Sequence, residues 1–313
     1  MGGSVKKILK AALVVAAVAT GIAFIPGIGA IATGAFTKGA VAYFATQTLV
    51  AGTLGLISSA LSPTPSAPSA ADLQGRTISR RNPLATRKVI YGEVRVGGTE
   101  TFLESAAGQK NIHQIITFAG HEVSAVTEVL FADLVVKNNP LDSVRYSPNS
   151  GTTPNYSSAS KITVHMGGAN QPADSDLVSE TGVDGNFRLL GCAYIYVRHT
   201  ADQDVFINGM PNVSLLVQGK PVLDPRTGLI VYSNNPALCI RDYLTSYLKV
   251  PANEIDDDLF IIAANICDET INLSGGGTEK RYTLNGVIDL KDTPKAILEQ
   301  LKTSCAAQIF EAN

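Results

Sequence analysis

The sequence predicts an α+β protein that begins with a hydrophobic helical hairpin, continues with a β-rich region and ends in a small α+β domain. Three observations predict this order. No charged residue occurs from Ala11 to Thr37, β-branched runs dominate from Lys88 to Ser233, and the hydrophobic period then changes from two residues to about 3.6. A chain of 313 residues is long enough for roughly two folded domains. We therefore expect four parts: a hydrophobic helical segment (1–61), a linker (62–82), a β-rich domain (83–233) and an α+β domain (234–313).

The apolar N-terminal segment is predicted to form two helices. The first stretch, Ala11 to Ile25, is short for a membrane span of about 20 residues. It is followed by the turn sequence Pro26-Gly27-Ile28-Gly29. The second stretch, from about Ala30 to Leu61, is long enough to cross a bilayer. Both are rich in Ala and Gly, whose small side chains allow two helices to approach closely.

Three interpretations of this segment fit its composition. Lys6, Lys7 and Lys10 precede an apolar run, as in a secretory signal, although the apolar sequence continues far beyond the length of such a signal. A resident membrane hairpin fits the length and the flanking lysines. A segment buried inside an oligomer also fits, because neighbouring subunits exclude water as lipid does. The run LSPTPSAPSAA, which starts at Leu61, predicts an extended linker over residues 62–82.

The β-rich domain is predicted to be mostly antiparallel sheet. Turn signals such as Gly97-Gly98 and Asp224-Pro225-Arg226-Thr227-Gly228 separate its apolar runs. Residues 138–160 contain three prolines and many Ser and Asn residues, so we expect a surface excursion there. The expected strands are Val89–Tyr91, Ile115–Phe118, Lys161–His165, Cys192–Val197 and Ser214–Val217.

Three helices are expected in the C-terminal domain. Asn235-Pro236 supplies an N-cap followed by proline, and the apolar stripe of that helix runs from Ile240 to Leu248. A second helix follows the acidic run Asp256-Asp257-Asp258, and Thr293-Pro294 begins a third. Between them we expect the second helix to end at Ser274–Gly277, and a strand over Arg281–Leu284 to turn at Asn285-Gly286. Another strand is expected to start at Ile309-Phe310.

Charge and cysteine content exclude several classes of function. The net charge is −2 with both signs interspersed, which argues against a specific nucleic-acid site. The four cysteines have no CxxC spacing, so neither a zinc site nor a redox motif is indicated. We expect buried free thiols at Cys192, Cys267 and Cys305, in keeping with a reducing cytoplasm. A basic run near the linker is expected to be solvated; it comprises Arg76, Arg80, Arg81, Arg87, Lys88 and Arg95.

No combination of residues predicts catalysis. The histidines His113, His121, His165 and His199 are isolated in strand-like surroundings, where a structural role is the usual one. His121-Glu122 opens like a zinc protease motif, but Ala125 stands where the second histidine belongs. The run Gly275–Gly277 is followed by Thr278-Glu279 and lacks the Lys-Ser/Thr of a phosphate loop. Adjacent carboxylates at Asp256–Asp258 point in different directions and rarely share one ion. We therefore expect no catalytic, cofactor-binding or metal-ligating residues, and no enzyme.

Four blocks of sequence, in order, resemble one family. The first is Asn82-Pro83 with Val89-Ile90-Tyr91-Gly92 and Arg95-Val96-Gly97-Gly98, and the second is Ala119-Gly120-His121-Glu122-Val123 with Glu128-Val129-Leu130-Phe131 and Asp133. The third is Gly219-Lys220, Asp224–Gly228, Tyr232–Ala237 and Cys239–Leu244, and the fourth is Ala263–Asp268 with Arg281–Gly286. From about Arg80 onward the chain is similar to phage tail-tip proteins of the lambda-type host-specificity family.

The resemblance implies a virion structural protein of the tail tip, namely the central hub. Such a subunit is expected as a homotrimer that closes the tail tube and takes part in host attachment and genome release, without a cofactor. Its expected partners are other tail-tip and distal tail proteins, with the tape measure protein as a further candidate. The sequence ends soon after Ile309-Phe310, and two interpretations follow: a fragment of a longer hub protein, or one piece of a split hub.

The resemblance also bears on the apolar segment, because virion proteins assemble in the host cytoplasm and need no export signal. We hypothesise that three copies of Lys7–Leu61 bundle on a three-fold axis inside the tail tip. A second hypothesis is that this segment inserts into host envelope lipid during infection. The alternative function is a membrane-anchored β-domain protein that binds a ligand.

Overall fold

A computed structural model describes residues 10–15 and 84–312, and for 10–15 and 310–312 it describes only the backbone. The rest of the expected helical segment 1–61 and the expected linker 62–82 lie outside these residues. Within the described part of the chain, no helix reaches the length and apolarity that crossing a membrane requires.

The strands are β1 (Lys10–Val15), β2 (Lys88–Tyr91), β3 (Glu93–Val96), β4 (Thr99–Ala106), β5 (Asn111–Ala119), β6 (Ala125–Phe131), β7 (Leu134–Asn138), β8 (Arg145–Tyr146), β9 (Ser160–His165), β10 (Ala193–Thr200), β11 (Val213–Gln218), β12 (Pro221–Asp224), β13 (Leu229–Tyr232), β14 (Thr270–Asn272), β15 (Thr278–Lys280), β16 (Gly286–Asp289) and β17 (Ala307–Ala312). The helices are α4 (Ser175–Thr181), α5 (Pro236–Asp242) with the π-helical turn Tyr243–Tyr247, the 3₁₀ turn Ala252–Glu254, α6 (Asp257–Asp268) and α7 (Pro294–Thr303).

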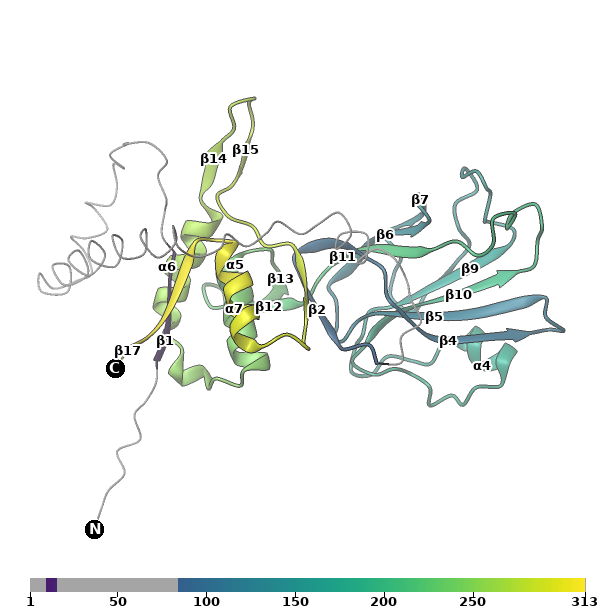
Figure 1. Ribbon diagram of the computed structural model, residues 1–313, viewed down its shortest axis with the longest axis horizontal. Helices are drawn as coiled ribbons and strands as arrows, with labels where there is room; N and C mark the ends of the chain where they lie inside the picture. The colour runs from purple at the N-terminus through teal and green to yellow at the C-terminus, as the bar shows by residue number, and fades with distance from the viewer. Residues whose placement is uncertain (1–9, 16–83, 313) are drawn as a thin grey trace, which may run out of the picture. The chain divides into compact units, whose positions relative to one another are not determined.

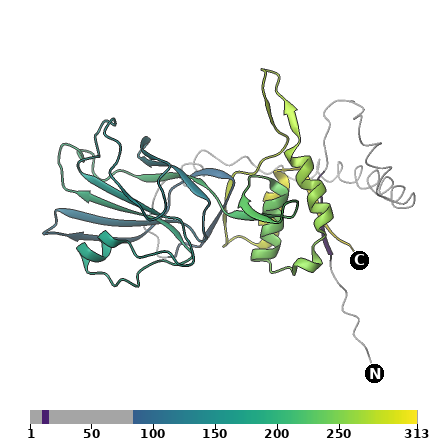
Figure 2. The same cartoon turned by 180° about the vertical axis from the view of Figure 1, so that it is seen from behind.

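Two antiparallel sheets share the larger hydrophobic core of the β-rich region (Figures 1 and 2). One has the strand order β4-β5-β10-β9-β8 and the other β3-β11-β6-β7. Apolar residues of both sheets face this core, among them Ile116, Ile162, Ile195, Val129 and Leu215, each fully buried. The expected strands Val89–Tyr91, Ile115–Phe118, Lys161–His165 and Ser214–Val217 are confirmed.

The five-stranded sheet is also covered on its other face. Tyr194 and Tyr196 of β10 pack there with Ile115 of β5 and Leu177 of helix α4. This double coverage explains why Ile115 and Ile116 are both buried although consecutive side chains of a strand point to opposite faces. Helix α4 had no signal in the hydrophobic periodicity; it is short and begins at the N-cap Asp174.

Residues 138–160, expected to form a surface excursion, are mostly irregular and contain the two-residue strand β8 between the end of β7 and the start of β9. This segment is not wholly a surface feature, however. Tyr156 is buried and packs edge-on against Phe131, with ring centroids 5.2 Å apart. The Tyr156 side chain therefore packs the excursion against the core that the two sheets share.

The three expected C-terminal helices are confirmed, as are the expected caps of the first and third, Asn235 and Thr293. Asn235, Asp256 and Thr293 each accept a hydrogen bond from a backbone N–H in the first turn of α5, α6 and α7. Their apolar faces form a second core that also contains Val89, Tyr91 and Val222. Residues from the predicted β-rich domain thus contribute to the core of the C-terminal one.

Two predictions in this domain are wrong. Helix α6 ends at Asp268, and the run Ser274–Gly277 instead forms the tip of the β14–β15 hairpin, which projects from the helices in Figure 1. The predicted strand Arg281–Leu284 is irregular; the strand β16 begins at Gly286 and hydrogen-bonds to β2. The reason is long-range pairing, because β2 offers a partner to Gly286–Asp289.

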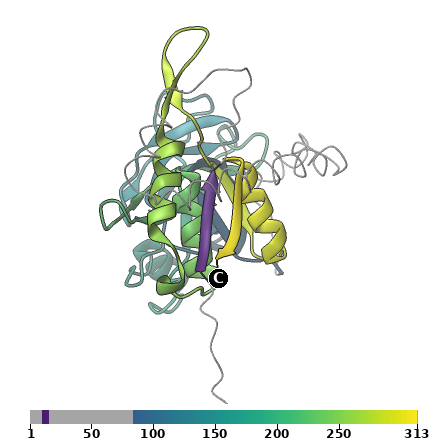
Figure 3. The same cartoon turned by 90° about the vertical axis from the view of Figure 1, so that its left-hand side faces the viewer.

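The helix predicted from Ala11 is wrong over the residues that the structure describes. Lys10–Val15 is a strand, paired antiparallel with β17 from Lys10 opposite Ala312 to Val15 opposite Ala307 (Figure 3). The strand expected at Ile309-Phe310 is thereby confirmed as part of β17. An apolar, partly β-branched run pairs readily with an open strand edge, and this tertiary contact overrides the helical interpretation.

Candidate assembly site around the β12–β13 hairpin

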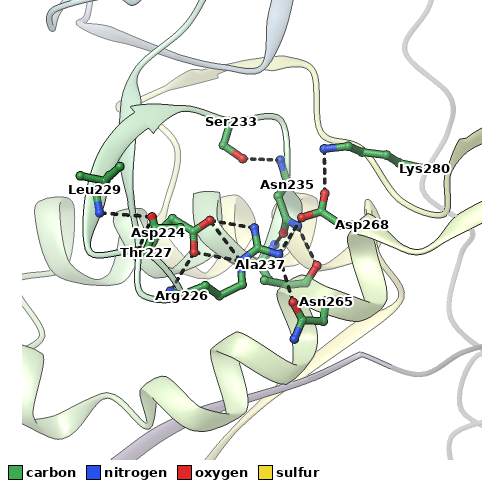
Figure 4. A network of polar contacts seen from close by, with 11 residues as sticks. Asp224, Arg226, Thr227, Leu229, Ser233, Asn235, Ala237, Asn265, Asp268 and Lys280 are labelled. Atoms are coloured by element: carbon green, nitrogen blue, oxygen red, sulfur yellow. Dashed lines mark hydrogen bonds and ion pairs between the residues drawn. The ribbon is translucent and has the colours of Figure 1, made fainter.

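A polar network surrounds the turn between β12 and β13 (Figure 4). Arg226, in the turn, donates from Nε and Nη2 to both carboxylate oxygens of Asp224 at 2.8–3.1 Å. Its Nη1 donates to Asp268 at 2.8 Å and to Asn265 at 3.2 Å, so the turn is bonded to the end of α6. Lys280 of β15 contacts the other oxygen of Asp268 at 2.7 Å. Arg226 therefore connects two separate carboxylates, which its planar guanidinium is suited to do.

The electrostatics of this network favour the ionised carboxylates. The hydrogen bonds from Arg226 lower the pKa of Asp224. Burial alone would raise the pKa of Asp268, but the hydrogen bonds from Lys280 and Arg226 outweigh burial and lower that pKa. The same two carboxylates raise the pKa of Arg226. The network thus remains charged over the neutral range and holds the turn in one geometry.

A fully buried asparagine extends the network toward α5. The side-chain oxygen of Asn235 accepts from the N–H of Ala237 at 3.0 Å, while its Nδ2 donates to the carbonyl of Ala264 at 2.9 Å. Its backbone N–H donates to the hydroxyl of Ser233 at 3.1 Å (Figure 4). Asn235 therefore caps α5 and links it to α6 at the same time.

The strand β13 of this hairpin exposes apolar side chains, while the polar network around Arg226 holds the turn of the hairpin in place. Val222 of β12 is buried in the C-terminal core, whereas Leu229, Ile230 and Val231 of β13 are 60%, 69% and 44% exposed. Among the described strands, β13 pairs only with β12, so its other edge is open. Consecutive exposed apolar residues on an open edge are typical of a surface that another chain covers. Three adjacent apolar residues cannot all face inward from a two-stranded hairpin, and this is the sequence signal that could have indicated the exposed run Leu229–Val231.

A second network joins β2 to α5. Lys220 donates to both carboxylate oxygens of Asp242 at 2.7 Å and to the Ser246 hydroxyl at 3.0 Å. The hydroxyl of Tyr91 donates to Asp242 at 2.5 Å. Burial, and then the charge of Asp242, raise the pKa of Tyr91. The ammonium of Lys220 also lies 4.9 Å from the centre of the Tyr247 ring.

The structure places His113, His121, His165 and His199 in the interior, each with a hydrogen-bond partner. His165 lies between Ser143, 3.2 Å from Nδ1, and Asp174, 3.3 Å from Nε2. In a serine hydrolase the serine faces Nε2 and the carboxylate faces Nδ1, and here these positions are reversed. Asp174 also caps α4. We therefore interpret the contacts of His165 with Ser143 and Asp174 as ones that hold α4 on the five-stranded sheet.

Other residues considered for chemistry lie apart from these networks. Asp256 caps α6, while Asp257 bonds Arg241 through two hydrogen bonds of 2.7 and 3.0 Å. Cys267 and Cys305 are buried as predicted. The prediction for Cys192 is wrong, because it lies just before β10 and its side chain is partly exposed. Arg95, expected to be solvated, bonds Asp133 and Ser214 at 2.9 and 3.0 Å.

No protein-family model matches the chain, and no curated protein matches it. One solved structure, described as the virion of a native gene transfer agent particle, is similar to part of it with a TM-score of 0.33 and 17% identity. The similarity covers 46% of this chain and 29% of that one, so the chain spans less than a third of the length of its structural neighbour.

Proposed function

We propose that this chain is a structural protein of a phage-like virion and forms the central hub of the tail tip. One observation carries the proposal: residues from separate blocks of the tail-tip resemblance contact one another in the folded chain. Tyr91 belongs to the first block and Lys220 and Asp242 to the third, and all three meet in one hydrogen-bonded group. Arg226 of the third block and Asp268 of the fourth meet in another.

These contacts give the resemblance a physical basis. The blocks are far apart in sequence, and the fold brings side chains from the first, third and fourth of them into shared hydrogen-bonded groups. The glycines of the blocks fit the same interpretation. A Cβ added at Gly92 would lie 2.0 Å from the carbonyl oxygen of Leu284, and one added at Gly219 would lie 2.2 Å from that of Ile90. Each glycine thus permits a close approach between two blocks.

A hub acts by assembly, and the exposed strand β13 is the surface that we assign to it. In the proposed hub, three copies close the tail tube, and neighbouring tail-tip proteins, with the tape measure protein as a candidate, cover the remaining surface. The apolar residues 1–61 would then serve as the lumen plug or the envelope-inserting segment. Both roles for this segment are proposals that its composition motivates.

The decisive experiment is complementation of a particle that lacks the chain. Wild-type chain should restore particles, copurify with them in a multiple of three copies, and be labelled at the tail tip by electron microscopy. The variant Ile230→Lys should fold with an unchanged circular dichroism spectrum but fail to enter particles. The matched control Leu190→Lys alters another exposed leucine, 48% exposed and outside the hairpin, and should assemble normally. Recovery of complete particles without the chain would refute the proposal.

The alternative is a membrane-anchored protein whose β domain binds a ligand. The uncharged run from Ala11 to Thr37 is the observation that favours it. Fractionation separates the two: a hub should sediment with particles, whereas an anchored protein should remain with membranes in cells that make no particles.

A further inference from the structure

A cavity of about 680 Å³ lies between the strands β4 and β5, the segment that leads into β2, and Cys192, which precedes β10. Its volume lies within the range of small-molecule sites, roughly 300 to 1,000 Å³. Its wall contains two basic side chains, Arg87 and Lys88, and the hydroxyls of Thr99, Thr101 and Thr117. None of these residues belongs to the β12–β13 hairpin or its networks.

The backbone around the cavity departs from regular pairing at two places. The register between β4 and β5 shifts between Glu100 and Phe102, which leaves Thr101 as the extra residue. The register between β5 and β10 shifts between Ala193 and Tyr194, which leaves Phe118 without a partner. Both Thr101 and Phe118 line the cavity. Bulges of this kind redirect side chains and are frequent beside binding sites.

The two cations are positioned but not neutralised. A Cβ added at Gly120 would lie 2.8 Å from Cβ and 3.2 Å from Cδ of Arg87, so the aliphatic stem of the arginine rests on this glycine. The N–H of Gly120 also donates to the carbonyl of Lys88 at 2.9 Å. Within the described residues, neither the Arg87 guanidinium nor the Lys88 ammonium forms a side-chain ion pair.

The remaining charge in the wall belongs to Glu100. One of its oxygens accepts a hydrogen bond of 2.7 Å from Gln114, a neutral partner. Two cations against one carboxylate leave the cavity with a net positive charge. The hydroxyls of Thr101 and Thr117 lie 3.2 Å apart and can each donate to or accept from an oxygen-rich ligand.

From this geometry we propose that the cavity binds a phosphate group carried on a polyol. The phosphate would contact Arg87 and Lys88, and the threonine hydroxyls would contact the hydroxyl groups of the polyol. The same chemistry occurs in free polyol phosphates and in the headgroups of anionic phospholipids. The proposal is independent of the hub function, because the residues that line the cavity belong to neither the hairpin nor its networks, and binding needs no assembly.

Cys192 provides a direct measurement of occupancy. It lines the cavity and is partly exposed, whereas Cys239, Cys267 and Cys305 are fully buried. Alkylation of the full chain by iodoacetamide should therefore modify Cys192 selectively, and a Cys192→Ser variant should lose this rapid modification. A ligand at ten times its Kd should slow alkylation about tenfold, because only the unoccupied fraction reacts.

The experiment compares five probes. Glycerol 3-phosphate should protect Cys192, inorganic phosphate should protect it more weakly, and glycerol should not protect it. Vesicles of phosphatidylglycerol, set against vesicles of phosphatidylcholine, distinguish a lipid headgroup from a free ligand. Protection should be lost in Arg87→Gln/Lys88→Gln and retained in Lys110→Gln, which removes an exposed lysine at the β4–β5 turn. Absence of protection by every phosphate probe, or equal protection of the double variant, would overturn the proposal.

Discussion

The backbone N–H of Ile90 donates a hydrogen bond of 2.9 Å to Nε2 of His121. The other ring nitrogen of His121 lies 2.7 Å from the carbonyl oxygen of Glu122, to which it can only donate. These two partners fix one neutral tautomer, with the proton on Nδ1. His121 thereby joins β2 to the residues that follow β5 of the five-stranded sheet. Strand β2 also contributes to the C-terminal core. His121, which begins a sequence similar to the zinc protease motif, therefore has a structural role.

Replacement of His121 should destabilise the fold. His121→Ala leaves the buried N–H of Ile90 without an acceptor, which should cost about 1–3 kcal/mol in the free energy of unfolding. Urea denaturation at pH 7.5 measures this loss. The control Glu122→Ala truncates the exposed neighbouring side chain and should change stability little. Equal stability of the two variants would show that the Ile90 bond contributes nothing.

The buried histidines should make the fold sensitive to acid. Burial lowers the pKa of His121 and of His199 to about 4, from an ordinary value of 6.5. Between these values the unfolded chain binds protons that the folded chain does not, so stability falls as the pH drops from 6.5 to 4. Each histidine should contribute a loss of about 3 kcal/mol, complete once both states are protonated.

His199→Gln isolates one contribution to this pH dependence. The slope of unfolding free energy against pH, measured by urea titrations between pH 6.5 and 4.5, should decrease by the equivalent of about one proton. His199 suits this test because its single hydrogen-bond partner in the described chain is the hydroxyl of Ser160, at 2.8 Å. An unchanged slope would mean that His199 has the same pKa in the folded and the unfolded chain.

Two aspartates that pair with arginine should respond differently to neutralisation. Asp268 lies between Arg226 and Lys280 with 24% of its side chain exposed, whereas Asp133 pairs with Arg95 at 92% exposure. Asp268→Asn should therefore cost about 1–2 kcal/mol, and Asp133→Asn less than about 0.5 kcal/mol. Thermal unfolding of both variants at neutral pH gives the comparison. A larger loss for Asp133→Asn would contradict the role of the network at the hairpin.

Local signals predicted the elements that depend on local chemistry. Asn235 and Thr293 cap helices because their side chains reach nearby N–H groups, and such short-range bonds leave a recognisable sequence pattern. The strand β16 was misplaced because its position depends on β2, almost two hundred residues away in sequence. The network of Arg226 with Asp268 and the cavity beside Cys192 likewise arise from tertiary contacts. No spacing in the sequence encodes either of them.

Gly219 should tolerate no side chain. The Cβ of an alanine there would lie 2.2 Å from the carbonyl oxygen of Ile90 and 2.6 Å from its carbonyl carbon, both backbone atoms that cannot move aside alone. Gly219→Ala should therefore destabilise the chain by about 2 kcal/mol or more. Gly185→Ala is the matched control, because an added Cβ there meets no atom within 4 Å. Similar melting temperatures for the two variants would refute the close approach of β2 to the β11–β12 connection.

The pairing of β1 with β17 can be tested by a disulfide. Val14 lies opposite Gln308 in the antiparallel register, and opposed residues of such a pair have their Cβ atoms about 4.5–5.5 Å apart. Val14→Cys/Gln308→Cys in a Cys192→Ser background should therefore form an intramolecular disulfide on mild oxidation, detected by mass spectrometry of peptides. Ala12→Cys/Gln308→Cys shifts one partner by two residues and should cross-link far less. Preferential cross-linking of the Ala12→Cys/Gln308→Cys pair, or equal cross-linking of both pairs, would contradict this register.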